Sequence, residues 1–264
     1  MITGQSFDTM KQLRLSAMIS EYRRQYELHS AMDSLTFDER LDMLLEAERL
    51  YRENTKLQRL TKAANLRDKS ASLKNIDYDP VRKLDRTQIA RLSGCDWIRK
   101  KRNLFITGKC GTGKTFLSSA FGSAAVQLGY PVKSFKMTRL LSEMSAAENS
   151  GSLDKYLDDL KKPPLLILDD FGLARFDARR CMDFYDVVDD RQDFGAILIT
   201  SQLPVLEWHA VFDDATYADA ILDRLVHNSE RIEVHGPSRR RYPQSEVDCY
   251  ESANAPMPAS EQIN

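Results

Sequence analysis

The segment that most constrains this chain is a glycine-rich loop between an apolar run and a helix-like run. Residues 108–115 read G-K-C-G-T-G-K-T, which matches the phosphate-binding pattern G-x-x-x-x-G-K-[ST]. The apolar segment Leu104–Thr107 precedes the loop and the helix-like segment Phe116–Phe121 follows it. The motif therefore has the strand–loop–helix context that it requires, and it predicts a nucleotide phosphate site. The alternative is a glycine-rich turn that contains G-K-T by chance.

Each residue type in the loop has a physical role at such a site. Gly108, Gly111 and Gly113 allow left-handed backbone angles, so that successive N–H groups turn inward, and the following helix N-terminus attracts anions. Lys114 places a charge on the β- and γ-phosphates, and the Thr115 hydroxyl binds Mg²⁺. We therefore assign ATP binding to Gly108, Lys109, Cys110, Gly111, Thr112, Gly113, Lys114, Thr115 and Phe116.

A second apolar run ends in two carboxylates. Residues 165–170 read L-L-I-L-D-D, and a run without polar alternation is typical of a strand that is buried on both faces of a parallel sheet. At the end of this strand, Asp169 would hold the water shell of Mg²⁺. Asp170 stands where a hydrolytic ATPase places the carboxylate that polarises the attacking water. The alternative is a strand that ends in a solvated Asp-Asp turn.

A third apolar run, residues 196–202, also ends in polar residues. Ligands of open α/β sheets lie at the carboxyl ends of the strands, so Thr200, Ser201 or Gln202 would contact the γ-phosphate or the attacking water. We take Ser201 and Gln202 as catalytic candidates; the alternative is a simple loop start. A polar strand end of this kind suits ATPases with an additional strand better than small-molecule kinases or GTPases.

The order of apolar and helical patterns predicts the fold class. Strands are expected at 103–107, 131–135, 165–169, 196–200 and 231–234, with helical patterns between them. This alternation is typical of an α/β fold, here a parallel five-stranded sheet with helices on both faces. Asn149–Ser152 is expected to divide the segment 138–162 into two helices.

Residues 1–75 are expected to form a small all-helical N-terminal domain. Apolar spacing favours a helix over Phe7–Tyr26, and Thr36 with Glu39 forms a capping box for the next one. Basic residues outnumber acidic ones between residues 49 and 74. This basic face is either solvated or binds DNA or a partner, and its DNA-binding candidates are Arg52, Lys56, Arg59 and Lys62.

Composition narrows the class further. The formal net charge is −1, so any affinity for DNA must come from local patches. The four cysteines form no C-x-x-C pair, which indicates neither a disulfide framework nor a zinc site. Without a long apolar run, we expect a cytoplasmic protein that does not contact membranes. The expected divisions are 1–75, a nucleotide-binding core at 76–242 and a disordered tail at 243–264.

From about Leu35 to His235 the chain resembles IstB, the ATPase helper of insertion-sequence transposition, and more distantly the helicase loader DnaC and the initiator DnaA. The resemblance rests on L-L-I-L-D-D-F-G at 165–172, I-T-S-Q-L-P at 199–204 and D-R-L-V-H-N-S-E-R-I at 223–232. It implies a P-loop AAA+ core, the cofactors ATP and Mg²⁺, ATP-dependent homo-oligomers on double-stranded DNA and a cognate IstA-like transposase as partner.

The resemblance also implies roles for single residues. It aligns Arg224 with the arginine finger that reaches the γ-phosphate of a neighbouring subunit, whereas the alternative is a local pair with Asp223. It places an additional DNA-facing helix after the second strand, which makes Lys136, Arg139 and Lys155 candidates for contacts with the DNA backbone. The alternative there is a surface hairpin of helices.

The expected function is therefore that of a DNA-binding transposition helper with slow, DNA-stimulated ATP hydrolysis. Slow turnover is expected because Asp170 replaces the glutamate of many AAA+ proteins and its side chain is shorter. Two alternatives remain: a DnaC-like helicase loader, which would favour single-stranded DNA, and a P-loop small-molecule kinase, which would ignore DNA. Tyr51 is one of few aromatic residues on the basic helix, which favours duplex DNA.

Overall fold

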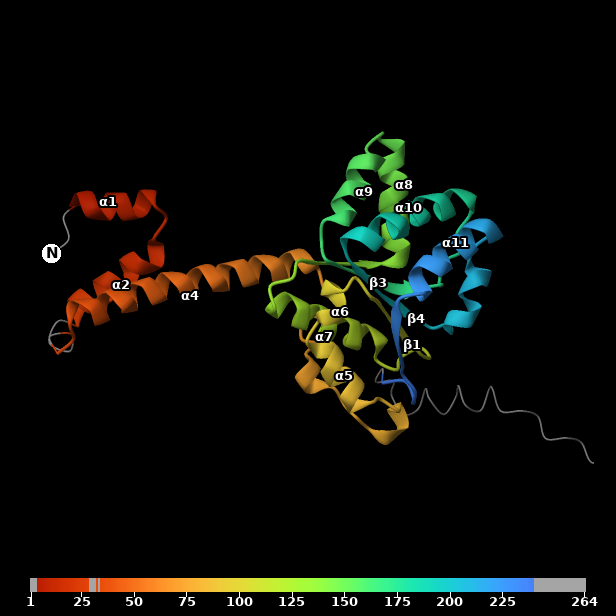
Figure 1. The fold of residues 1–264 in the computed structure, drawn as a ribbon, viewed down its shortest axis with the longest axis horizontal. Helices are drawn as coiled ribbons and strands as arrows, with labels where there is room; N and C mark the ends of the chain where they lie inside the picture. Colours follow the sequence, from red (N-terminus) through yellow and green to blue (C-terminus); the bar gives the residue numbers. More distant parts are fainter. Residues whose placement is uncertain (1–3, 29–31, 33, 240–264) are drawn as a thin grey trace, which may run out of the picture.

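A parallel five-stranded sheet forms the centre of the molecule (Figure 1). The structure, a computed structural model, describes residues 4–28, 32 and 34–239. The strand order is β2-β3-β4-β1-β5, and every neighbouring pair is parallel. The fold class predicted from the sequence is confirmed, with strands β1 (Asn103–Thr107), β2 (Val132–Lys136), β3 (Leu165–Phe171), β4 (Ala196–Ser201) and β5 (Ser229–Glu233).

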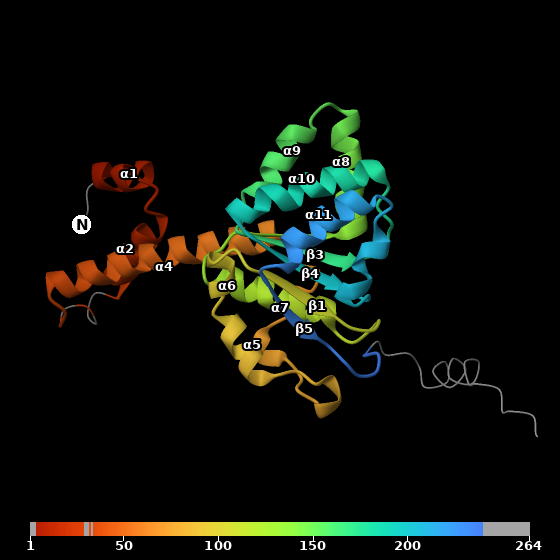
Figure 2. The same cartoon turned by 45° about the vertical axis from the view of Figure 1, so that its right-hand side comes forward.

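Helices cover both faces of this sheet (Figure 2). On one face lie α5 (Arg86–Ser93), α6 (Asp96–Arg99) and α7 (Lys114–Gln127). On the other lie α8 (Met137–Asn149), α9 (Leu153–Lys161), α10 (Ala178–Phe194), the 3-10 helix η3 (Val205–Val211) and α11 (Ala215–Val226). Successive strand residues alternate between two hydrophobic layers: Leu104 and Ile106 pack towards α7, and Phe105 packs towards η3. Both layers are apolar, which explains why the inner strands β1, β3 and β4 show no polar alternation.

The N-terminal region forms an arm that projects from this body (Figure 1). It contains α1 (Gly4–Gln12), α2 (Ser16–Glu27) and the long helix α4 (Phe37–Ala64). The capping box of Thr36 and Glu39 is confirmed at the start of α4. The prediction of one helix over Phe7–Tyr26 is wrong, because Arg14 adopts a left-handed φ of 57° and separates α1 from α2.

A contact from a distant residue accounts for that break. The Glu48 carboxylate on α4 accepts hydrogen bonds from the backbone N–H groups of Ala17 and Met18, at 3.1 and 3.2 Å. These N–H groups lie at the start of α2, where a helix lacks internal acceptors and a carboxylate is favoured. The start of α2 is thus set by packing against α4, which periodicity along residues 7–26 does not reveal.

The end of α4 joins the arm to the body. Asn65, with a φ of 49°, ends the helix, and Ala64 and Leu66 are buried in the layer beneath the sheet. Leu66 packs on Gly122 of α7 so closely that a Cβ atom at Gly122 would lie 2.6 Å from a Leu66 methyl group.

The domain boundary at residue 75 stays a prediction, and the predicted tail at 243–264 lies outside the described residues. In the described part of the chain, no helix combines the length and apolar character of a membrane span.

A buried arginine stabilises the region at the amino ends of β3 and β4. Arg191 on α10 is 1% exposed and donates hydrogen bonds to the carbonyl oxygens of Leu160, Pro163 and Ala196 at 2.7, 3.0 and 2.8 Å. These carbonyls belong to the end of α9 and to the starts of β3 and β4. One guanidinium therefore satisfies three backbone acceptors from three segments.

We expect Arg191→Met to lower the free energy of unfolding by about 3 kcal/mol, because three buried carbonyls lose a charged donor. Urea denaturation followed by circular dichroism measures this loss. Arg180→Met on the same helix is the control, since Arg180 is only partly buried and its nearby ion-pair partner is the exposed Asp177, so that its replacement should cost less than about 1 kcal/mol. Equal losses in the two variants would contradict the bracing role.

Candidate nucleotide site

The glycine-rich loop has the left-handed backbone that its sequence predicted. It leaves the end of β1, and α7 begins at Lys114. The φ angles of Gly108, Gly111 and Gly113 are 150°, 78° and 94°. A Cβ atom at Gly108 would lie 2.2 Å from the carbonyl oxygen of Val234, which follows β5. Both conformation and close approach therefore require glycine at this position.

The lysine of the motif points into the loop. The Lys114 ammonium donates hydrogen bonds to the carbonyl oxygens of Gly108 and Lys109, both at 2.7 Å, and the residue is 7% exposed. Its charge is thus held inside the curve of the backbone that would surround a phosphate. Of the other predicted binding residues, Cys110 is exposed on the loop, whereas Phe116 on α7 is partly buried against the layer under the sheet.

Two arginines brace the outside of the loop. Arg82, 4% exposed, donates to the carbonyl oxygens of Thr112 at 3.0 Å and Asp77 at 2.6 Å. The Arg239 N–H donates to the Gly111 carbonyl at 2.9 Å, and its guanidinium pairs with the Asp77 carboxylate. Sequence reasoning missed both residues, because an arginine in a loop has no local signal that distinguishes it from a solvated one.

The end of β3 places the first acidic residue beside the loop. The Thr115 hydroxyl donates to both carboxylate oxygens of Asp169, at 3.2 and 3.1 Å, and Asp169 is 3% exposed. A hydroxyl and a carboxylate are hard oxygen ligands, which Mg²⁺ prefers. The residues predicted to hold Mg²⁺ thus lie together and have suitable chemistry for it.

A threonine at the end of β4 links both carboxylates of the acidic motif. The Thr200 hydroxyl is fully buried; it donates to Asp169 and accepts a hydrogen bond from the Asp170 N–H at 3.0 Å. Asp170 itself has a left-handed φ of 63°. This geometry makes Thr200, one of three polar residues at this strand end, the one in contact with the acidic pair.

The other two polar residues, Ser201 at the end of β4 and Gln202 after it, make different contacts. The buried Ser201 hydroxyl donates to the Phe171 carbonyl at 2.8 Å and accepts from the Leu203 N–H at 3.1 Å, so it supports the backbone after the motif. Gln202 lines a cavity of about 800 Å³ that also includes Gly108 and Lys109 of the loop. The catalytic roles of Ser201 and Gln202 stay predictions.

Two cations lie against the acidic pair. Nη1 of Arg67 is 2.6 Å from an Asp169 carboxylate oxygen and 2.9 Å from one of Asp170, and these hydrogen bonds raise the pKa of Arg67. Lys136, at the end of β2, lies 3.7 Å from Asp170. Arg67 was absent from the sequence-based assignment, because it lies in the basic run after α4, far along the chain from the acidic motif.

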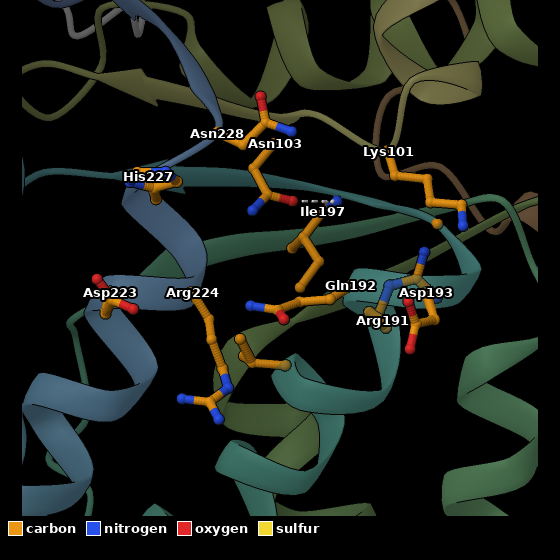
Figure 3. Close-up of a pocket in the computed structure, with 12 residues that line it drawn as sticks. Lys101, Asn103, Arg191, Gln192, Asp193, Ile197, Asp223, Arg224, His227 and Asn228 are labelled. Carbon is orange, nitrogen blue, oxygen red and sulfur yellow. Dashed lines mark hydrogen bonds between the residues drawn. The ribbon is translucent and has the colours of Figure 1, made fainter.

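Arg224 lies near the amino ends of the strands, whereas the loop lies at their carboxyl ends. Figure 3 shows it on α11, and it lines a cavity of about 440 Å³ that also includes Asn103, the first residue of β1. Its guanidinium donates to Asp189 at 2.6 Å and to the Tyr185 hydroxyl at 2.7 Å, both on α10. The alternative of a local pair with Asp223 is wrong, because α10 packs against α11 and supplies the carboxylate.

The residues predicted to contact DNA lie on separate elements. Arg52, Lys56 and Arg59 line one shallow cavity of about 500 Å³ on the arm, together with Leu13 and Tyr51. Lys62 and Lys155 are exposed on α4 and α9, and Arg139 on α8 pairs with Glu143 at 2.7 Å. Lys136 lies beside Asp170, within the nucleotide site. Their contacts with DNA stay predictions.

The chain matches a known protein family. The model of the IstB-like ATP binding protein family matches residues 8–247. The chain belongs to this family. A Pseudomonas fluorescens protein named as an ATP-binding protein of insertion sequence IS1162 is 40% identical over 204 residues, which cover 77% of this chain and 88% of the relative. The insertion sequence ATP-binding protein y4uH of Sinorhizobium fredii is 36% identical over 241 residues, or 91% and 96% of the two chains.

Solved structures support the fold of this IstB-like chain. DnaI aligns with a TM-score of 0.53 at 24% identity, over 65% of this chain and 91% of DnaI. AMPPCP-bound DnaA from Aquifex aeolicus aligns with a TM-score of 0.55 at 19% identity, over 72% of this chain and 61% of DnaA. The chain therefore shares the fold of DnaI and DnaA, which agrees with the predicted P-loop AAA+ fold class.

We expect Thr200→Val to reduce ATP hydrolysis and Mg²⁺-dependent nucleotide binding by about 10- to 100-fold, because Asp169 loses the hydroxyl that orients it. Phosphate release and fluorescent-nucleotide anisotropy measure the two effects. Thr200→Ser keeps the hydroxyl and should retain most activity. Ser201→Ala is the matched comparison: a larger loss in that variant would assign the role to Ser201 instead.

Proposed function

We propose that this protein is an ATP-dependent transposition helper that oligomerises on duplex DNA and recruits or stimulates a cognate transposase at target DNA. ATP binding favours assembly, and slow hydrolysis of ATP to ADP and phosphate drives disassembly. The family and the insertion-sequence relatives support the biological context. The position of Arg224 is the observation that carries the mechanism.

The sheet itself separates Arg224 from the loop of its own subunit. Asn103 and Thr107 are the first and last residues of β1; Arg224 shares a cavity with the former, and Gly108 of the loop follows the latter. From Asn103 to Gly108 the chain advances five residues, or about 17 Å, which is beyond the reach of an arginine side chain. This separation supports a role for Arg224 at the ATP site of a neighbouring subunit, as a finger that stabilises charge on the γ-phosphate during hydrolysis.

The roles within one subunit follow from the site. The loop and Lys114 bind the phosphates, and Thr115 with Asp169 would hold Mg²⁺, which supplies positive charge at the β- and γ-phosphates. The Asp170 carboxylate, beside Asp169, accepts a hydrogen bond from the attacking water and orients it. Its short side chain favours slow turnover, which suits a switch that must stay assembled while a partner arrives.

We expect duplex DNA to stimulate ATP hydrolysis, and Arg224→Ala to lose about a thousandfold of the stimulated rate, because the finger is removed. Sizing of the DNA complex should show large assemblies in ATP that are lost in ADP. Asp189→Ala is the matched control: it removes the same ion pair but keeps the guanidinium, so hydrolysis should persist.

Mixing variants tests action between subunits. Lys114→Ala and Arg224→Ala proteins should each be inactive, but an equal mixture should regain up to about a quarter of the activity, since one in four interfaces then has a complete site. A mixture without any activity would argue against a finger supplied by a neighbour.

We also expect the double variant Lys56→Ala, Arg59→Ala to weaken duplex binding equally for unrelated sequences. The slope of log affinity against log salt should become shallower by about 2, because two phosphate contacts are lost. The control is Lys11→Ala with Arg24→Ala, two arm residues that pair with Asp8 and Glu21 on their own helices. An unchanged slope would show that this face of α4 does not contact DNA.

The choice of nucleic acid separates the alternatives. Stimulation by single strands alone would favour a helicase loader. Indifference to every DNA, with an unchanged oligomeric state in ATP, would overturn the proposal and favour a small-molecule kinase.

A further inference from the structure

Arg67 lies at the joint between the arm and the body, and its guanidinium contacts both carboxylates of the acidic motif. Nη1 lies 2.6 Å from Asp169 and 2.9 Å from Asp170. One of these carboxylates belongs to the nearly buried Asp169, so the ion pair is partly shielded from water on that side. Such a charge-assisted contact between residues about a hundred positions apart defines a specific geometry.

The backbone on either side of Arg67 is anchored to α7. Leu66 is buried against Gly122, and the Asp68 N–H donates to the Ser119 hydroxyl at 3.3 Å. Helix α7 is the helix that begins in the phosphate loop, so the Cα of Arg67 is held at a constant place relative to the site. The Arg67 side chain is 49% exposed, which leaves it room to turn outward without moving the backbone.

Two cations contact the two carboxylates of the acidic motif before any metal is considered. Asp169 and Asp170 supply two negative charges, and Arg67 and Lys136 supply two positive ones. The Asp169 oxygen that accepts from Arg67 also accepts from the Thr115 hydroxyl. The guanidinium thus contacts one of the two Asp169 oxygens that accept from Thr115, and a guanidinium and Mg²⁺ cannot share that oxygen without repulsion.

We propose that Arg67 is a built-in counter-ion that competes with Mg²⁺ for Asp169 and Asp170, and so sets the Mg²⁺ concentration at which nucleotide binds with its metal. When Mg²⁺ and nucleotide occupy the site, the Arg67 side chain leaves Asp169 and turns outward from its anchored backbone. The inference rests on the Mg²⁺ assignment of the proposed function and adds a regulatory residue to the same site.

The test is a Mg²⁺ titration of nucleotide binding. A fluorescent, non-hydrolysable ATP analogue is bound to the full chain, and its anisotropy is followed from excess EDTA to saturating Mg²⁺. Arg67→Gln should lower the Mg²⁺ concentration at half-saturation by about fivefold, the size expected for loss of one partly exposed competing ion pair. In EDTA, Arg67→Gln and the wild type should bind the analogue equally, because Arg67 contacts carboxylates and not the loop.

Two further variants separate competition from general charge effects. Lys69→Gln removes the same charge from an exposed position two residues along and should leave the Mg²⁺ midpoint unchanged. Arg67→Lys keeps a charge but loses the guanidinium Nη1 that donates to both carboxylates, so its midpoint should lie between those of the wild type and Arg67→Gln.

Three results would overturn the inference: an unchanged or raised midpoint in Arg67→Gln, an equal shift in Lys69→Gln, or weaker binding of Arg67→Gln in EDTA. The last result would instead place Arg67 on the nucleotide phosphates. Since the readout is nucleotide binding by the protein without DNA, a failure of DNA binding or oligomerisation leaves this result readable. A normal DNA response with no midpoint shift would reject the inference alone.

Discussion

The Asp169 carboxylate is the interaction on which the nucleotide site depends. It accepts hydrogen bonds from Thr115 on α7, Thr200 on β4 and Arg67 at the end of the arm. A carboxylate that is 3% exposed needs such partners, because burial without them costs several kcal/mol. The Asp169 carboxylate therefore connects three separate elements. Its hydrogen bonds fix the positions of the loop, the acidic motif and the end of β4 relative to one another.

Parallel pairing makes this convergence possible. The register pairs Phe105 of β1 with Ile199 of β4, and Ile199 with Leu168 of β3. The carboxyl ends of the three strands consequently meet at one edge, where the loop, Asp169 and Thr200 follow. Arg224 lies near the amino ends of the strands. The nucleotide site and the candidate finger are therefore at opposite ends of the strands. A chain with this polarity is suited to head-to-tail assembly.

Contacts between distant segments support the site from outside. Arg82 and Arg239 hold the outer side of the loop, and Leu66 fits against Gly122 where a larger residue would collide. The same joint carries Arg67 to the acidic pair. The arm and the nucleotide site thus share a structural connection, through which the state of one can affect the other.

The sequence by itself determined the fold class and the positions of the five strands, and it selected Thr115 and Asp169, which the structure places in contact. These follow from local patterns, since apolar runs, glycines and capping residues act through neighbours along the chain. It did not reveal the break at Arg14, the partner of Arg224, or the roles of Arg67, Arg82 and Arg191. Only the tertiary structure decided these, because the partner of a long charged side chain can come from a distant part of the chain. The residues next to an arginine in the sequence do not show whether it contacts water or a buried carboxylate.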